Sequence, residues 1–474
     1  MPLRFVACVL LTCAALPALR TPAAAAAEKP NVLFLLTDDQ RADTIAALGN
    51  PQIVTPNLDA LANRGFSFSE CHCLGANSGA VCFPSRNMIL SGRTYFEHEV
   101  RKGNRTYANP AKPNFAAALG AAGYETYHHG KKGNTASLLH GRFEHSKYLS
   151  NDHEVRMSGQ PGEEIVDAAL EFFANRTDDR PWAMYLAFAT PHDPRVAAEE
   201  YRSRYDPADL PIPPNFLPLH PYQIGSDTVR DELLAPFPRT LPDTRAQIHD
   251  YYSAITGLDH HIGRLLSDLE ARGDLENTLI VFSSDHGLSL GSHGRFGKQS
   301  LYRDSMRAPL VLAGPGVPHG RSDALVYLHD IYPTICDLLG VDPAGGSTVP
   351  AELHGRSFKA AMHGDDGGRP ALFGSYLDDQ RSVYDGRWKL IRFPKIGVTR
   401  LFDTETDPYE ILDLASDPAQ AGRIERLNAR LKQLQEEVGD DLDLDAPAVI
   451  DDPTFVPPDA TRLEELRRPW KGRS

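Results

Sequence analysis

The sequence predicts an α/β protein, with a large and mostly parallel β-sheet sandwiched by helices and a smaller C-terminal domain. Three continuous apolar runs, at 31–36, 182–188 and 278–283, are short, as in strands that a parallel sheet buries on both faces. Apolar residues at helical spacing over 248–269 predict one long amphipathic helix. The chain has 474 residues, which exceeds one ordinary core, so we expect two domains.

Further elements follow from local signals along the chain. We expect short helices at 55–65 and 114–121, a strand at 124–127 and a helix at 332–339. Short strands at 372–376, 381–384, 388–393 and 400–402 predict a small antiparallel sheet, with a helix over 424–438 packed on it and an acidic tail after Asp440 extended over the surface. The predicted divisions are a signal peptide at 1–27, an N-terminal domain at 28–345 and a C-terminal subdomain at 346–474 with its acidic tail.

The N-terminus and the charge limit where the protein acts and on what. Arg4, an apolar run over 5–19 and small residues at 23–27 are typical of a secretory signal, so we expect a periplasmic or secreted protein. No later apolar run is long enough to span a membrane. The net charge of −14 and the lack of a basic stripe argue against nucleic acid as a partner.

Carboxylates follow two of the predicted buried strands. Asp38 and Asp39 come after the first strand, and Asp285 and His286 follow the strand at 278–283. Adjacent carboxylates repel each other unless a cation or several donors compensate them, and ligands of open α/β sheets bind at the carboxyl ends of strands. The pattern indicates a site for a hard cation such as calcium. The alternative is a helix cap beside a surface acid.

A cysteine precedes a predicted helix at Cys82-Phe83-Pro84-Ser85-Arg86. Pro84 suits the first position of a helix and Gly92 ends it, which places Cys82 at the helix N-terminus. Such an end favours an anion and a reactive oxygen or sulfur. Arg86, one turn on, can return its guanidinium toward position 82 as an oxyanion contact. The alternative is a buried structural cysteine.

Other polar residues follow strands or occupy glycine-rich loops. Lys131, in a turn after the strand at 124–127, is either an anion contact or solvated surface. His192, between two prolines, is well held for proton transfer or has a structural role. Lys298 ends a glycine-rich loop that can return it to the same edge of the sheet, and His293 in that loop contacts either substrate or its own loop.

The segment 205–243 contains nine prolines and reads as a long irregular excursion. Loops of this length in compact domains are usually functional or disordered. We expect a stiff wall over the pocket that helps to select the substrate.

The segment from Cys82 to Arg86 resembles the Cys-x-Pro-Ser-Arg signature of type I sulfatases, the formylglycine-dependent family of the alkaline-phosphatase-like superfamily. The resemblance runs from Lys29 to about Pro418, because the other motifs follow in the family's order. These are Thr37-Asp38-Asp39-Gln40, Gly130-Lys131, Pro191-His192, Ser284-Asp285-His286-Gly287 and Lys298.

This resemblance implies a sulfatase whose residue 82 is converted to formylglycine (3-oxoalanine) by a maturation enzyme. It implies that a divalent cation, usually calcium, is bound by Asp38, Asp39, Cys82, Asp285 and His286. It further implies that Arg86, Lys131, His192 and Lys298 act with residue 82 in catalysis. Export and the proline-rich excursion favour a sulfated polysaccharide or oligosaccharide as substrate.

One position departs from the family. The histidine that often follows the Gly-Lys motif is replaced by Gly133 and Asn134. His128 or His129 takes over its part, or Asn134 serves by hydrogen bonding, and all three are candidate substrate contacts together with His293.

Two other functions remain open. A phosphodiesterase or phosphonate monoester hydrolase shares the fold and can share the formylglycine, and a secreted carbohydrate-binding protein would keep Cys82 unmodified.

Overall fold

The computed structural model describes Met1 and residues 29–97, 112–348 and 351–467. Apart from Met1, the predicted signal peptide at 1–27 lies outside the described residues. In the described ranges no helix is long and apolar enough to cross a membrane.

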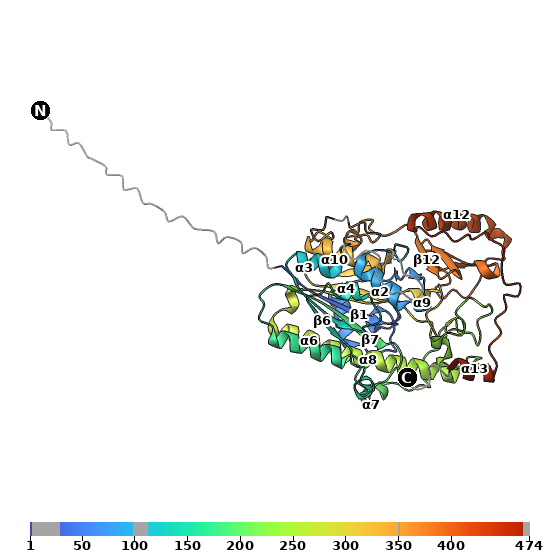
Figure 1. The fold of residues 1–474 in the computed structure, drawn as a ribbon, viewed down its shortest axis with the longest axis horizontal. Coiled ribbons are helices and arrows are strands. Elements are labelled where there is room, and N and C mark those ends of the chain that lie inside the picture. The colour runs from blue at the N-terminus through green and yellow to red at the C-terminus, as the bar shows by residue number, and fades with distance from the viewer. Residues whose placement is uncertain (2–28, 98–111, 349–350, 468–474) are drawn as a thin grey trace.

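An eight-stranded sheet forms the centre of the molecule (Figure 1), in the order β10-β2-β9-β8-β1-β7-β5-β6. Its strands pair in parallel except that β9 runs antiparallel to both β8 and β2, which confirms the predicted mostly parallel sheet. The strands are β1 Asn31–Asp38, β2 Phe66–Phe68, β5 Glu125–Gly130, β6 His145–Tyr148, β7 Trp182–Pro191, β8 Thr278–Ser284, β9 Leu310–Ala313 and β10 Gly320–Ser322.

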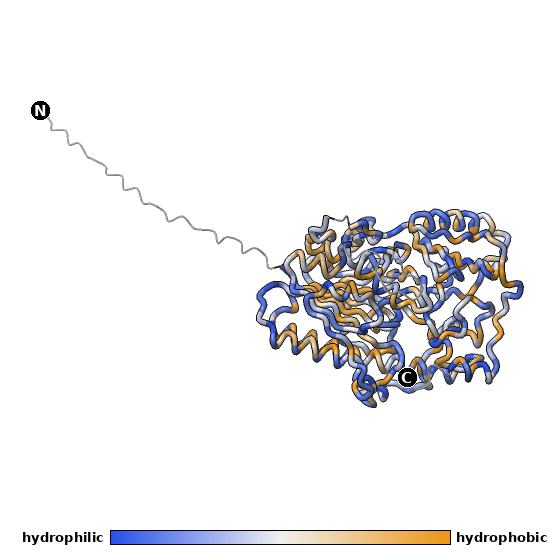
Figure 2. The backbone as a smooth tube through the Cα atoms, viewed as in Figure 1, coloured by the Kyte–Doolittle hydropathy of each residue, from blue (hydrophilic) through white to orange (hydrophobic). Residues whose placement is uncertain are grey.

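Helices cover both faces of this sheet, as Figure 1 shows. Alternate residues of β1 enter different cores: Phe34 packs in the core with α2, α3 and α10, and Leu35 in the core with α1, α6 and α8. Figure 2 shows hydrophobic residues concentrated along the strands between these layers. The helices are α1 Pro56–Arg64, α2 Cys82–Ser91, α3 Phe115–Ala121, α6 Glu163–Asn175, α8 Leu241–Arg272 and α10 Ile331–Leu339.

The C-terminal part forms the predicted antiparallel sheet, with helix α12 Ala421–Val438 packed against it. Its strands are β12 Leu372–Tyr376, β13 Gln380–Tyr384, β14 Trp388–Phe393 and β15 Val398–Asp403. A fifth strand, β4 Gly75–Ala76, comes from the N-terminal part and pairs in parallel with β12. The two parts therefore share one sheet, and the division at residue 345 stays a prediction.

The tail after Asp440 differs from its predicted extended form, because it ends in helix α13 Ala460–Arg467. It runs back from α12 across the molecule (Figure 1) and contacts the proline-rich excursion. Thr454 bridges to Tyr222, and the ring of Phe455 packs on Phe237 with centroids 5.6 Å apart. The tail thus packs against the excursion, in which η2 spans Arg230–Leu234.

Short elements complete the described fold. The strands β3 Cys71–His72 and β11 Val326–Tyr327 pair with each other. The remaining short helices are η1 Ala46–Leu48, α4 Ser137–His140, α5 His153–Arg156, α7 Glu199–Arg202, η3 Leu275–Asn277, α9 Arg303–Met306, η4 Leu328–Asp330, α11 Lys359–Met362, η5 Pro394–Ile396 and η6 Pro418–Gln420.

Candidate active site

The carboxyl ends of β1 and β8 bring the predicted acidic residues together. The two strands are parallel neighbours, with Thr37 opposite Ser284. Asp38 ends β1, and Asp285 follows β8 at the same edge of the sheet. Both carboxylates are fully buried. The register of two parallel strands therefore creates this charged edge.

Helix α2 presents Cys82 to the same edge. The helix begins at Cys82, two residues before the predicted start, so that Pro84 is its third residue. Proline is tolerated there because the first four N–H groups of a helix have no partner within it. The sulfur of Cys82 lies 3.2 Å from His286 Nε2 and 3.9 Å from Asp39 Oδ1. Burial, with the charge of Asp38, raises the pKa of this thiol well above its ordinary value.

Asp38 is held by cations and an amide. Its Oδ2 accepts hydrogen bonds from Lys131 Nζ at 2.8 Å and Asn134 Nδ2 at 3.0 Å, and Arg86 Nη2 lies 3.4 Å away. Burial would raise the pKa of Asp38, but the charges of Lys131 and Arg86 keep it well below its usual range. Asp38 is therefore an ionised carboxylate inside the protein.

Asp39 has a left-handed backbone, with φ of 71°. Its N–H donates to Asp285 Oδ1 at 3.1 Å and its carbonyl accepts from the Tyr251 hydroxyl, which hold this uncommon conformation. Its carboxylate accepts from Lys298 Nζ at 2.7 and 3.1 Å. Burial lowers the pKa of Lys298, but Asp231 and Asp39 raise it well above the ordinary value, so the lysine stays charged.

Arg86, one turn after Cys82 in α2, links the ends of β1 and β8. Its Nε donates to Asp285 Oδ2 at 2.9 Å, and its Nη2 donates to the Thr37 carbonyl at 3.3 Å. The side chain is 1% exposed, so a permanent charge lies inside the site. Substituting Lys would lose this forked contact.

The buried donor set fits a divalent cation. One ligand atom from each of Asp38, Cys82, Asp285 and His286 lies within 4.8 Å of the others. His286 Nδ1 donates to the Gly287 carbonyl, which leaves the Nε2 lone pair facing this cluster. Among the described residues, Asp38 Oδ1 is buried without a hydrogen-bond partner. An unsatisfied buried carboxylate oxygen is an available metal ligand, and carboxylates favour hard cations.

His192 joins the site with residues that the sequence did not reveal. Its Nε2 lies 3.3 Å from Arg230 Nη2, and its Nδ1 donates to the Asp193 carbonyl at 2.7 Å. Arg230 pairs with Asp193 and Asp231, and Asp231 Oδ2 lies 3.7 Å from Lys298 Nζ. Burial and then Lys131 lower the pKa of His192. The proline-rich excursion thus supplies charged residues to the site. In the sequence, only the proline content of this segment indicated such a role.

The remaining predicted contacts are placed differently. His129 lines the cavity described below, and both its ring nitrogens lack partners within the described structure. His128 is fully buried, and its ring stacks on His140 with centroids 4.0 Å apart. His293 stacks on Tyr302 at 3.9 Å and bonds Asn215, so the structure places it in loop packing away from the Cys82 cluster. Asn134, in contrast, contacts Asp38 directly.

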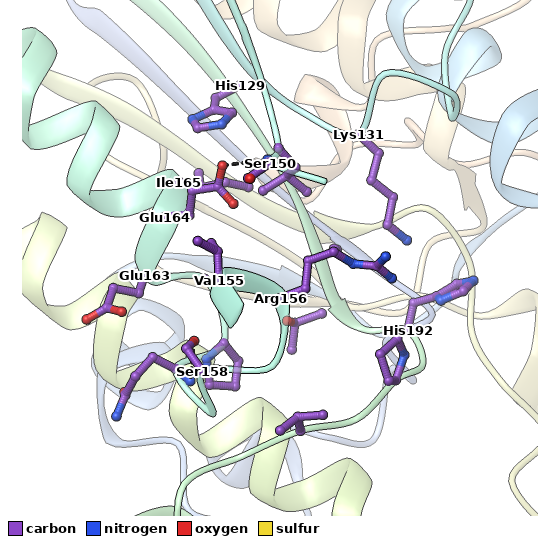
Figure 3. Close-up of a pocket in the computed structure, with 18 of the residues that line it drawn as sticks. His129, Lys131, Ser150, Val155, Arg156, Ser158, Glu163, Glu164, Ile165 and His192 are labelled. Carbon is purple, nitrogen blue, oxygen red and sulfur yellow. Dashed lines mark hydrogen bonds between the residues drawn. The ribbon is translucent and has the colours of Figure 1, made fainter. Parts of the chain in front are cut away.

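A cavity of about 1380 Å³ opens beside the cluster (Figure 3). Lys131, Asn134, His192 and Arg230 line it, whereas Cys82 does not. The cavity extends from these residues toward the start of α6. This space can hold groups attached to a small anion bound at Lys131.

Comparison with known proteins is consistent with this geometry. A profile described as "Sulfatase" matches residues 30–341, and one described as "N-sulphoglucosamine sulphohydrolase, C-terminal" matches residues 291–437. An N-acetylglucosamine-6-O-sulfatase of Bacteroides thetaiotaomicron is 25% identical over 84% of this chain and 83% of its own.

Two solved structures share the fold. One was determined in complex with D-glucosamine-2-N,6-O-disulfate, with a TM-score of 0.71, 24% identity and coverage of 88% of this chain and 100% of its own. The other is a phosphonate monoester hydrolase of Silicibacter pomeroyi, with a TM-score of 0.69, 24% identity and coverage of 87% and 96%. The profile match spans more than half of the chain, and the protein therefore belongs to the sulfatase family and is a sulfuric ester hydrolase.

Proposed function

We propose that this protein hydrolyses sulfate esters of sulfated polysaccharides or oligosaccharides, with formylglycine made from Cys82 and with Ca²⁺ as its cation. The supporting observation is the placement of Cys82 at a helix N-terminus, within 4.8 Å of the buried ligand atoms of Asp38, Asp285 and His286. The similarity to a glucosaminide sulfatase supports a sugar substrate. This proposal assigns both the nucleophile and the substrate class.

The metal would be held by Asp38, Asp39, Asp285 and His286 together with residue 82. When bound, it supplies positive charge that favours an ionised nucleophile and stabilises the negative charge of the transferring sulfate group. The three carboxylates select a hard cation, and calcium accepts such oxygen-rich sites. His286 is the one nitrogen donor of the set.

The charged residues around position 82 bind and orient the sulfate ester. The formylglycine hydrate would supply the attacking oxygen. Arg86 fixes the two carboxylates that flank this oxygen, through its contacts to Asp285 and Asp38. Lys131 contacts Asp38 and Lys298 contacts Asp39, and their ammonium groups can bind sulfate oxygens there.

We assign His192 to contact with the leaving oxygen of the ester. It lines the cavity and is oriented by Nδ1–H donation to the Asp193 carbonyl, which directs Nε2 into the site. Lys298 is 2% exposed and lies on the metal side, so it acts on the sulfate rather than on the sugar. Asn134 takes the place of the family histidine by hydrogen bonding to Asp38.

The decisive experiment is mass spectrometry of the tryptic peptide 65–86 after co-expression with a formylglycine-generating enzyme. This peptide contains Cys71, Cys73 and Cys82, so the first two are internal controls for alkylation. The proposal predicts that Cys71 and Cys73 become alkylated, whereas residue 82 carries an aldehyde. Alkylation of Cys82 in fully matured preparations contradicts the proposed nucleophile and favours a carbohydrate-binding protein.

Substrate assays then separate sulfatase from phosphonate hydrolase activity, whose fold this chain also shares. Sulfate release from sulfated glycans and aryl sulfate is compared with the rate on an aryl phosphodiester, because both esters carry one negative charge. We expect the higher kcat/KM on the sulfate ester. Cys82→Ala is the matched control and should lose both activities.

Export completes the proposal. The N-terminal pattern at 1–27 supports a periplasmic or secreted protein. Fractionation of expressing cells, followed by N-terminal sequencing of the mature protein, tests this location. Retention in the cytoplasm with an intact N-terminus would contradict it.

A further inference from the structure

Arg156 is a cation in the cavity wall that has no side-chain partner among the described residues. It is the last residue of α5, it is exposed, and it lines the same cavity as Lys131 and His192. Within the described part of the chain, its guanidinium takes part in no ion pair and no side-chain hydrogen bond. An arginine without a partner can bind an anion without losing a contact that it already makes.

The other cations of this cavity have partners in the described structure, and Lys132 has the weakest of them, the Tyr148 ring at 5.7 Å from its Nζ. Lys131 is bonded to Asp38, and Arg230 to Asp193. Lys147 is paired with Glu171 at 2.9 Å. Arg195 donates to Gln247 Oε1 at 2.8 Å and lies over the Tyr251 ring. These partners set Arg156 apart from them.

The cavity is also electrically asymmetric. Figure 3 shows the Arg156 side chain directed toward the end at which Lys131 and His192 lie, whereas Glu163 and Glu164 lie toward the α6 side. Glu164 accepts a hydrogen bond from the Ser150 N–H at 2.7 Å. The end of the cavity nearest Lys131 thus carries Arg156, Arg195 and Arg230 beside Asp193, with Glu154 also on α5, although the whole chain carries a net charge of −14.

Building on the proposed sulfatase function, we propose that Arg156 binds a second anionic group of the substrate, a sulfate or a carboxylate on the sugar. The planar guanidinium can donate two parallel hydrogen bonds to either oxyanion. The ester to be cleaved occupies the Lys131 end, and the second anion lies on the neighbouring wall. The substrate class is then a saccharide with at least two negative charges, and Arg156 sets this specificity.

The test compares matched sulfated disaccharides that share the scissile sulfate. One member of each pair carries a second sulfate or a uronate, and the other has a hydroxyl or the neutral methyl ester of that uronate. We expect wild-type kcat/KM to be about tenfold to a hundredfold higher for the dianion, because hydrogen bonds between charged groups are strong. This ratio should fall at high ionic strength. A larger kcat/KM ratio for the sulfate pair would identify the second anion as a sulfate, and a larger ratio for the uronate pair would identify it as a carboxylate.

Three variants test whether the preference for the dianionic substrate depends on Arg156. In Arg156→Ala the ratio should approach one, and in Arg156→Lys it should fall partway, because an ammonium keeps the charge but loses the fork. Lys147→Ala is the matched control, since it removes a paired cation of the same cavity wall and should keep the wild-type ratio. Circular dichroism and Tm of each variant check folding.

Isothermal titration with the same disaccharides gives a second readout that does not depend on turnover. A dianion preference in Kd that disappears in Arg156→Ala supports the proposal even if no sulfate is released, and that result would contradict only the proposed activity. Equal affinity of the wild-type protein for both members of every pair overturns the role of Arg156. A preference for the dianion that survives in Arg156→Ala also overturns the role of Arg156.

Discussion

Two clusters of buried charges in this protein are built differently. In the active site, Asp38, Asp39 and Asp285 face a shared space, and Asp38 Oδ1 has no hydrogen-bond partner in the described structure. At the junction with the C-terminal sheet, Glu70 pairs with Arg303, and Glu410 pairs with Lys389 at 2.6 Å.

The junction leaves no such gathering of acids. Glu70 Oε2 also bonds His72 Nε2 at 2.9 Å, and Glu410 accepts the Arg303 backbone N–H at 2.8 Å. The two carboxylates there face three cations, because Glu70 also lies 3.6 Å from Arg307 Nη1. The difference teaches that a buried carboxylate stabilises the fold where it lies against its own cations, and that carboxylates which converge on one space indicate a ligand. Four experiments test this comparison.

The largest effect is expected from Asp39→Asn. The substitution removes one negative charge from the convergent set and weakens the contact to Lys298. Because a bound metal supplies several kcal/mol of transition-state stabilisation, we expect kcat/KM for sulfate release to fall by at least about a thousandfold. Thermal unfolding should no longer respond to added Ca²⁺. Activity within tenfold of wild type would contradict the metal assignment.

Removal of the metal from the wild-type protein should destabilise the folded state. Dialysis against a chelator leaves the three carboxylates with Arg86, Lys131 and Lys298 as their partners in the described structure, without the charge of the metal. Free Ca²⁺ at a thousandfold above its Kd should stabilise the folded state by about 4 kcal/mol, measured as a shift in urea unfolding. Asp39→Asn is the control, and its urea unfolding should not change when Ca²⁺ is added. If Mg²⁺ restores stability as well as Ca²⁺ does, the choice of calcium is wrong.

Glu70→Gln tests the junction. It leaves Arg303 buried without its partner, and we expect the free energy of unfolding to fall by about 3 kcal/mol at pH 7. Burial opposes ionisation, but His72 and Arg303 lower the pKa of Glu70 to about 2. The carboxylate therefore stabilises the fold above its ordinary pKa of 4.5, and this stability is lost as the pH falls from 4.5 toward 2.

Urea unfolding of both proteins between pH 7 and pH 3 measures this effect. The difference in free energy of unfolding between wild type and Glu70→Gln should become smaller as the pH falls toward 3. Glu352→Gln removes an exposed carboxylate that pairs with Lys112 and is the matched control without measurable effect. A Ca²⁺ response that is altered in Glu70→Gln would show that the two clusters are not independent.

The smallest effect is expected from Asn134→Ala. This residue donates to Asp38 Oδ2 at 3.0 Å, and loss of one hydrogen bond to a charged group should lower kcat about tenfold. Asn151→Ala changes another amide of the cavity lining and should keep the wild-type rate. His128→Ala and His129→Ala test whether a histidine shares the role, and a loss larger than that of Asn134→Ala would favour it.

The sequence predicts much of the charged edge, because its residues directly follow apolar runs. Asp38 and Asp285 are recognisable as strand-end acids, and parallel pairing of β1 and β8 then brings them together. The start of α2 was wrong by two residues, since proline is compatible with any position of the first turn. The two-residue strand β4 carries no periodic signal, so its pairing with β12 could not be expected.

Arg230 and Asp231 could not be identified from the sequence for a different reason. They lie in the proline-rich excursion, where charged residues look like solvated surface. Their contacts with Asp193 and Lys298 depend on how the excursion folds back over the sheet. Likewise, the return of the tail as α13 depends on contacts with η2 rather than on a strong apolar stripe.

The position of α13 has a consequence for the order of events during synthesis. The ribosome delivers the charged edge, the excursion and both sheets before it releases residues 460–467. Arg467 then contacts the Ala235 carbonyl at the end of η2, near Arg230. A nascent chain can therefore complete its central sheet while the segment that carries Arg230 still lacks its contact with α13, and that segment gains the contact only after residues 460–467 have been made.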